Sequence, residues 1–285
     1  MQAEDVNFLI IGAAKSATTW LQQTLQTDPE VSVPDPELHY FSRFYHKGHD
    51  WYFDQFPRTE GKRLVGEKSN SYLDTPAAAE RVRMLLPHAK LIVQLRNPVE
   101  RAYSDYCMLY RRGEVGDDIR AHLSSQGNVK SRFLVGGCYY DQLQQYRERF
   151  PESQMLVLLF EDMIADPDAQ IKQVRGFLGL RADVPRVVVA KKVKDRSEPM
   201  IGPRLRKAVK PLKPLLRPIR ANPVFAAFWG RLAREISYPP LTPEVRSELI
   251  DFYAADVERL AKLLKRDLSY WLEPTSLDGL ARAGN

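Results

Sequence analysis

Short apolar runs alternate with amphipathic stretches along the first two thirds of the chain. Val6–Ile11 and Lys90–Leu95 are almost wholly apolar, which is typical of strands buried on both faces of a parallel sheet. Arg63–Glu67 and Gln154–Phe160 predict two more strands. The alternation with helical patterns predicts an α/β fold with a central parallel sheet flanked by helices.

Apolar residues at helical spacing predict the intervening helices. The predicted ranges are Thr18–Gln26, Ala77–Leu86, Pro98–Arg111, Tyr139–Phe150 and a helix that opens at Asp166-Pro167 and ends at Gly179. A C-terminal helix is predicted over 242–266, where Thr242 and Pro243 supply the cap and the first turn.

The length of 285 residues suits one large α/β domain or two small ones, and we expect a single domain over residues 1–285. The chain is 44% apolar and 27% charged, as in ordinary globular proteins. We find no signal-peptide pattern and no apolar run long enough to span a membrane, so a cytoplasmic location is expected. Cys107 and Cys138 are the two cysteines, which argues against a disulfide framework or a zinc site, and no metal is expected.

Positive charge is concentrated in residues 191–220, which hold eleven lysines and arginines against two acids. Prolines interrupt 191–240, so we interpret this segment as a lid or as part of an acceptor cleft. Its charge suits an anionic glycan, a solvated surface or, with the apolar residues of 204–229, peripheral membrane contact. No nucleic-acid-binding motif accompanies it, so a nucleic-acid partner is not expected.

The stretch from Phe8 to Leu21 has the pattern of a phosphate-binding loop. An apolar strand runs into Gly12, small residues carry Lys15, and a helix opens at Thr18 and Thr19. Loop amides, a helix N-terminus and one lysine together suit an anion. The pattern lacks the Gly-Lys-Ser/Thr of a Walker A loop, which argues against a nucleoside triphosphatase.

Two further signals follow strands of the predicted sheet. Arg96 directly follows Lys90–Leu95, and Ser104 lies two turns into the next helix, where both can approach one anion. Glu67 and Lys68 end another strand. A carboxylate at the mouth of a phosphate site repels the ligand, which favours a general base there over a simple exposed ion pair.

Together these motifs resemble the sulfotransferases that use 3′-phosphoadenosine-5′-phosphosulfate (PAPS), especially the heparan-sulfate branch and its bacterial relatives. Lys15–Thr19 is similar to the family's 5′-phosphosulfate loop, and Arg96…Ser104 to its 3′-phosphate motif. Glu67–Tyr72 resembles a Glu-Lys-Ser/Thr-Pro-x-Tyr segment, and 194–199 a Lys-Gly-Arg-x-x-Pro loop. The motifs of 137–161 and 177–180 resemble later helices and a strand.

The resemblance implies a three-layer P-loop-like fold and sulfuryl transfer from PAPS that releases 3′,5′-ADP. It assigns proton removal to Glu67 and charge stabilisation to Lys15, and it counts Lys194, which would close over the nucleotide with Arg196, as a third catalytic residue. The residues that it places against the nucleotide are Lys15, Ser16, Ala17, Thr18, Thr19, Trp20, Arg96, Ser104, Tyr139, Lys194 and Arg196. Ala17 stands where the family usually has glycine, so we expect no positive φ there. Asn70 stands in place of the usual proline.

The acceptor is less well indicated. Pro36-Glu-Leu-His-Tyr-Phe41 stands where the resembled branch has Lys-Glu-x-x-Phe-Phe near its acceptor cleft. We therefore expect Glu67, Lys68, His39 and Tyr40 to contact a carbohydrate hydroxyl or amine, although such an aromatic stretch also suits an ordinary core. A lipid or small-molecule acceptor, and a non-catalytic nucleotide- or glycan-binding protein on the same scaffold, are the alternatives.

Overall fold

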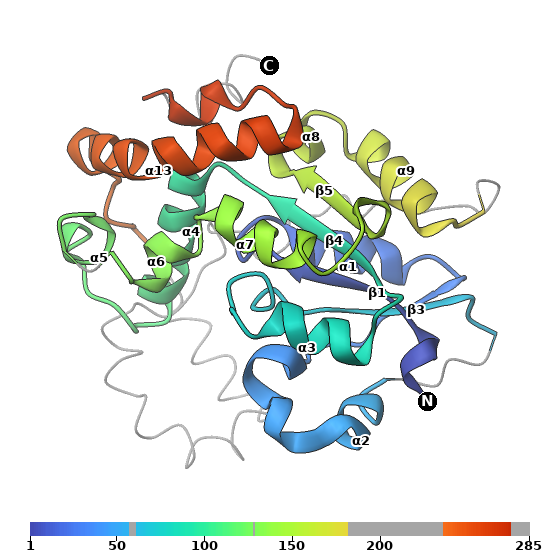
Figure 1. Cartoon of the computed structure of the whole chain (residues 1–285). Coiled ribbons are helices and arrows are strands. Elements are labelled where there is room, and N and C mark those ends of the chain that lie inside the picture. The colour runs from blue at the N-terminus through green and yellow to red at the C-terminus, as the bar shows by residue number, and fades with distance from the viewer. Residues whose placement is uncertain (57–60, 128, 182–235, 275–285) are drawn as a thin grey trace, which may run out of the picture.

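The computed structural model describes residues 1–56, 61–127, 129–181 and 236–274 (Figure 1). Its centre is a five-stranded parallel sheet in the order β2-β3-β1-β4-β5. The strands are β1 (Val6–Gly12), β2 (Val31–Ser32), β3 (Leu64–Lys68), β4 (Lys90–Leu95) and β5 (Met155–Leu159). All five strands end at the same edge of the sheet, so the loops that follow them meet there.

Helices cover both faces of the sheet. α1 (Thr18–Gln26) and α9 (Pro167–Leu178) pack on one face, where Phe8, Ile10 and Ile92 meet Leu21 and Val174. The other face carries α3 (Ala78–Leu85), α4 (Pro98–Arg111), α7 (Tyr139–Arg147) and α13 (Pro243–Leu264). The predicted α/β architecture is therefore confirmed.

The predicted element bounds agree with the structure to within three residues wherever both are defined. Helices over Thr18–Gln26 and Pro98–Arg111 and the strand Lys90–Leu95 have the predicted bounds. The sequence patterns did not predict β2, which has two residues, or several short helices. The missed helices are α2 (Gly48–Phe53), α5 (Arg120–Leu123), α6 (Arg132–Val135) and α8 (Phe160–Ala165), with a π-helix at Tyr40–Phe44 and 3-10 turns at Ala3–Asp5, Tyr45–Lys47, Glu152–Gln154 and Ser269–Leu272.

Parts of the predicted site lie outside the described residues. They include Lys194, Arg196 and residues 191–235 of the basic segment. The roles predicted for them therefore stay predictions. Within the described ranges, no helix combines the length and apolar character needed to cross a bilayer.

The loop between β1 and α1 has an unusual backbone. Gly12 passes so close to the next segment that a Cβ atom would come within 2.7 Å of the Leu73 Cβ, so this position requires glycine. Ala17 caps α1 with φ 60°, in the left-handed region. The expectation that alanine here indicates a negative φ is wrong. The chain turns into α1 at this residue, and the turn places Ala17 in the left-handed region.

Replacing Ala17 by glycine is expected to stabilise the protein by about 1 kcal/mol. The left-handed conformation costs an L-residue about 1–2 kcal/mol, and the greater freedom of unfolded glycine offsets part of the gain. Urea unfolding of A17G measures the change. The control is A255G on the exposed side of α13, which is expected to lose about 1 kcal/mol. If A17G and A255G destabilised the protein equally, the backbone of Ala17 would not be strained.

Candidate active site

The loop after β1 forms an anion cradle at the carboxyl edge of the sheet. Thr18 and Thr19 open α1, and Lys15 precedes them with φ 71°. The Ser16 side chain is fully buried, and its Oγ has no hydrogen-bond partner among the described residues. A buried hydroxyl inside a loop of this shape fits an anionic ligand that supplies the missing acceptor.

Arg96 approaches this loop from the end of β4. Its Nη1 donates to the Lys15 carbonyl over 3.3 Å, and its guanidinium lies 4.5 Å from the centre of the Phe160 ring. The following residue, Asn97, caps α4 and donates its backbone N–H to Glu161. The structure thus brings Lys15 and Arg96 together, as predicted from strand ends alone. Ser104 lies two turns into α4, nearly buried.

A chain of contacts from α13 holds Arg96 in place. Both carboxylate oxygens of Asp256 accept from the first backbone amides of α7, those of Tyr139 and Tyr140. The Tyr139 hydroxyl then donates to the Arg96 carbonyl over 2.9 Å. Because the Tyr139 side chain is wholly buried, the structure gives it a supporting place behind Arg96; the predicted nucleotide contact stays a prediction.

Glu67 occupies a closed polar pocket at the end of β3. Its side chain has no exposed surface and accepts hydrogen bonds from Tyr72 at 2.5 Å, Ser69 at 2.7 Å and Tyr52 at 3.3 Å. Burial raises the pKa of Glu67 to about 7, against the opposing effect of these donors. The carboxylate expected to face the acceptor is instead enclosed by hydroxyl groups.

This buried carboxyl makes stability depend on pH. Because the pKa of Glu67 lies above the ordinary 4.5, the folded state binds the proton more tightly and loses stability as pH rises through this window. The loss amounts to about 3 kcal/mol between pH 4.5 and 7. E67Q is expected to remove that loss, measured by urea unfolding at pH 5, 6 and 8. Exposed Glu4→Gln controls for the exchange, and parallel pH curves for wild type and E67Q would contradict the assignment.

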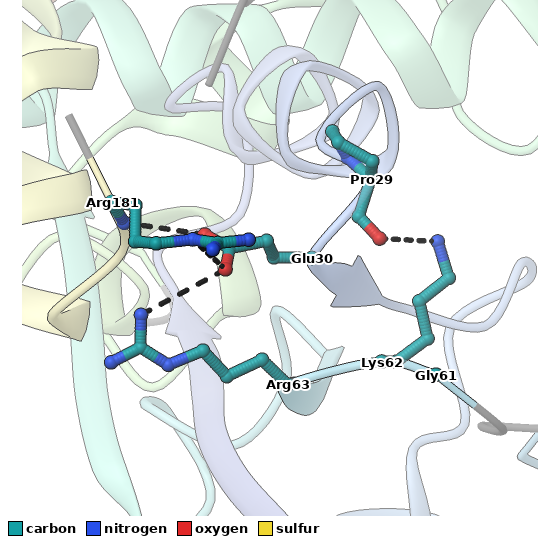
Figure 2. A pocket seen from close by; sticks show the side chains of 6 residues that line it. All are labelled: Pro29, Glu30, Gly61, Lys62, Arg63 and Arg181. Carbon is teal, nitrogen blue, oxygen red and sulfur yellow. Dashed lines mark hydrogen bonds and ion pairs between the residues drawn. The ribbon is translucent and has the colours of Figure 1, made fainter. Parts of the chain in front are cut away.

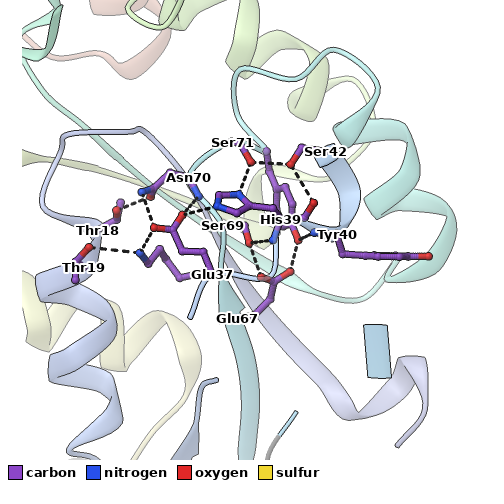
Figure 3. Close-up of polar contacts among 12 residues, drawn as sticks. Thr18, Thr19, Glu37, His39, Tyr40, Ser42, Glu67, Ser69, Asn70 and Ser71 are labelled. Carbon is purple, nitrogen blue, oxygen red and sulfur yellow. Dashed lines mark hydrogen bonds and ion pairs between the residues drawn. The ribbon is translucent and has the colours of Figure 1, made fainter. Parts of the chain in front are cut away.

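A second carboxylate, Glu37, lies between Glu67 and the anion cradle (Figure 3). It comes from the connection that follows β2, and its side chain is 21% exposed. Glu37 accepts from Lys68 Nζ at 2.7 Å and from the Asn70 amide at 3.0 Å. Lys68 also approaches Thr19 Oγ1 at 3.4 Å, and Thr18 donates to Asn70 at 2.5 Å. Two short paths therefore connect Glu37 with the start of α1.

Glu37 is ionised at neutral pH. Burial opposes its ionisation, but the charge of Lys68 and the hydrogen bonds from Lys68 and Asn70 outweigh burial and lower the pKa of Glu37. Lys68 is only 2% exposed, so this pair is held in a low-dielectric setting beside the loop. The result is an ionised carboxylate with access to solvent.

His39 and Tyr40, both predicted to contact the acceptor, take different places. His39 Nδ1 lies 2.7 Å from Ser71 Oγ, and burial lowers the pKa of its imidazole, which is neutral at pH 7. Its Nε2 lies 3.7 Å from Glu37 Oε2. Tyr40 is fully buried and stacks on Tyr52 with ring centres 4.6 Å apart. His39 therefore borders Glu37, whereas the Tyr40 ring belongs to the aromatic core.

A cavity of about 760 Å³ lies elsewhere, before the start of β2 and β3 (Figure 2). Its basic side chains are already engaged: Lys62 donates to the Pro29 carbonyl, and Arg63 and Arg181 pair with Glu30. The cavity is at the amino ends of the strands, opposite the loop. We therefore place the site at the polar cluster around the loop.

Comparisons with known proteins show which family this chain is similar to. The family model described as "Sulfotransferase domain" matches residues 5–198. Heparan sulfate glucosamine 3-O-sulfotransferase 3B1 of Mus musculus is 35% identical over 178 residues, covering 61% of this chain and 46% of the relative. Bifunctional heparan sulfate N-deacetylase/N-sulfotransferase 2 of Homo sapiens is 34% identical over 195 residues, covering 61% and 22%.

The structural comparison extends further along the chain. A sulfotransferase from Alicyclobacillus acidocaldarius superposes with a TM-score of 0.70 at 27% identity, covering 94% of this chain and 99% of that one. The chain spans less than half the length of the two mammalian relatives named above. Residues 5–198, which the family model matches, include the loop, Glu37, Glu67 and Arg96.

Proposed function

Because the chain belongs to the family of sulfotransferase domains, we propose that it transfers a sulfuryl group from PAPS to a hydroxyl or amine of a carbohydrate acceptor. One observation carries the proposal: the cradle around Lys15, the guanidinium of Arg96 and the ionised carboxylate of Glu37 lie in one connected cluster. Anion binding and proton removal are the two tasks that this transfer requires.

The loop and β4 would hold the donor. Ser16, Thr18, Thr19 and the loop amides suit the 5′-phosphate, and Lys15 would stabilise the negative charge that develops there as the sulfur–oxygen bond to phosphate breaks. Arg96 would bind the 3′-phosphate, with Ser104 as a neutral donor. PAPS supplies the sulfuryl group as an electrophile when bound.

Glu37 is the general base that the geometry favours. It is ionised and partly exposed, and it is tied to the loop through Lys68 and Asn70. It would take the proton of the acceptor oxygen or nitrogen as that atom forms its bond to sulfur. Glu67, the base predicted from sequence, has no exposed surface, and a role for it in proton removal requires the surrounding hydroxyl groups to open.

The acceptor class follows from the relatives. Both mammalian relatives carry heparan sulfate in their names, which supports a carbohydrate acceptor for this chain. His39, which borders Glu37, and Ser71, which contacts His39, offer polar contacts for a sugar. A lipid or small-molecule acceptor is the second candidate, and its support is the basic segment 204–229.

Calorimetric titration with 3′,5′-ADP, 5′-AMP and ATP without added metal tests the donor. We expect tight binding of 3′,5′-ADP and much weaker binding of the other two. Labelled PAPS is then offered with heparan sulfate oligosaccharides, and in parallel with lipid and phenolic acceptors. Absence of 3′,5′-ADP binding would refute the proposal, and labelling of lipid or phenol alone would refute the carbohydrate acceptor.

A further inference from the structure

Asn70 lies at the centre of the polar cluster around Glu37 and the loop, and the family resemblance does not explain why asparagine stands there. The resembled segment usually has proline here, which has neither a backbone N–H nor a polar side chain. In this chain the Asn70 N–H donates to Glu37 Oε2 at 3.0 Å and its Nδ2 to Glu37 Oε1 at 3.3 Å. Its Oδ1 accepts from Thr18 Oγ1 at 2.5 Å (Figure 3).

The orientation of the Asn70 carboxamide follows from its neighbours. An ionised Glu37 can only accept hydrogen bonds, so the amide nitrogen must face it and the amide oxygen must face Thr18. The Thr18 hydroxyl, which has a single proton, therefore donates its hydrogen bond to Asn70 Oδ1. Because Thr18 is only 2% exposed, water does not compete as an acceptor for this hydrogen bond.

An anion in the cradle changes this arrangement. Phosphate oxygens only accept hydrogen bonds, so a phosphate that contacts Thr18 must take its hydroxyl proton. The Asn70 side-chain oxygen then loses its hydrogen-bond donor. If the Asn70 carboxamide rotates toward another donor, its nitrogen moves away from Glu37 Oε1. Lys68 donates to the same oxygen, so the hydrogen bonds that stabilise the charge on Glu37 change with the state of Thr18.

We propose that Asn70 is a positioning residue that couples occupation of the donor loop, through the Thr18 hydroxyl, to the hydrogen bonding of Glu37. The inference rests on the proposed function, since it takes the occupant to be the 5′-phosphate of the donor. Its consequence is that Glu37 becomes a stronger base when the donor is bound. Lys68 from β3 and His39 from the same connection as Glu37 are the other charged or titratable groups in contact with this carboxylate within the described residues.

Selective ¹⁵N labelling of asparagine tests the coupling without an acceptor. The chain has only six asparagines, and the Asn70 N–H reports the ionisation of the carboxylate that it contacts. In the wild type, the pH midpoint sensed by Asn70 is expected to rise when 3′,5′-ADP saturates the protein. In T18V, also saturated, the rise is expected to be smaller, because the charge of the ligand remains but the hydroxyl is absent.

Three controls separate the outcomes. E37Q must abolish the titration sensed by Asn70, and Asn7, at the opposite end of β1, must not respond. N70A is expected to bind 3′,5′-ADP as tightly as the wild type or up to a few-fold more tightly, since Thr18 gives up no partner. Equal midpoint shifts in wild type and T18V, or weaker binding by N70A, would overturn the coupling. Failure of the wild type to bind 3′,5′-ADP would instead refute the proposed function itself.

Discussion

Replacing Glu37 by glutamine is expected to slow sulfuryl transfer by about 10²–10⁴-fold, the usual contribution of a general base. Glutamine keeps the shape of the side chain and one oxygen that can accept from Lys68, but it cannot take a proton. Because the exchange leaves the loop and Arg96 in place, binding of 3′,5′-ADP is expected to change by less than about threefold. Turnover with labelled PAPS and calorimetry provide the two measurements.

The matched comparison is E67Q. Glu67 is enclosed by Tyr52, Ser69 and Tyr72, so its amide variant is expected to lose less than about tenfold in turnover and to differ mainly in the pH dependence of stability. A loss in E67Q as large as that in E37Q would return the role of base to Glu67. Thermal unfolding of both variants shows whether a loss of activity reflects loss of the fold, since E37Q leaves Lys68 buried beside a neutral partner.

Strand ends were the most informative feature of the sequence. Lys15 and Arg96 follow predicted strands and Glu67 ends one, and the structure brings the loop of Lys15 into contact with Arg96. The same logic applies to Glu37, which follows β2. However, β2 spans only Val31–Ser32, too short for an alternating pattern to predict it, so Glu37 was not recognised as a residue at the sheet edge. The signal that could have identified Glu37 is its place in the segment that stands where the resembled branch has Lys-Glu-x-x-Phe-Phe.

Other features depend on contacts between distant segments. Nothing in the sequence pairs Asp256 with the start of α7, 117 residues earlier, yet this contact orients the tyrosine behind Arg96. The left-handed backbone of Ala17 arises from the course of the loop and overrides the preference of its residue type. Which of two carboxylates is enclosed is likewise set by tertiary packing, because Tyr52 comes from a short helix that local pattern did not predict.

Replacing Arg96 by alanine is expected to weaken binding of 3′,5′-ADP by about 30- to 150-fold and to weaken binding of 5′-AMP far less, through loss of the hydrogen bond to the Lys15 carbonyl. A charged hydrogen bond to phosphate contributes about 2–3 kcal/mol, and alanine removes the whole guanidinium fork. R96K keeps the charge but not the fork, so an intermediate loss of about tenfold is expected. Calorimetric titration of all three proteins with both nucleotides measures these differences.

The 5′-AMP titration distinguishes a direct contact of Arg96 with the 3′-phosphate from a purely supporting role, because Arg96 also supports the loop. Its Nη1 donates to the Lys15 carbonyl, so R96A removes a brace from the cradle as well as a cation, whereas the backbone carbonyl that accepts from Tyr139 stays in place. If Arg96 acted only as a brace, both nucleotides would lose affinity to the same extent, since both place a 5′-phosphate in the cradle. A loss much larger for 3′,5′-ADP than for 5′-AMP requires a direct contact with the 3′-phosphate, the group that distinguishes PAPS from ATP.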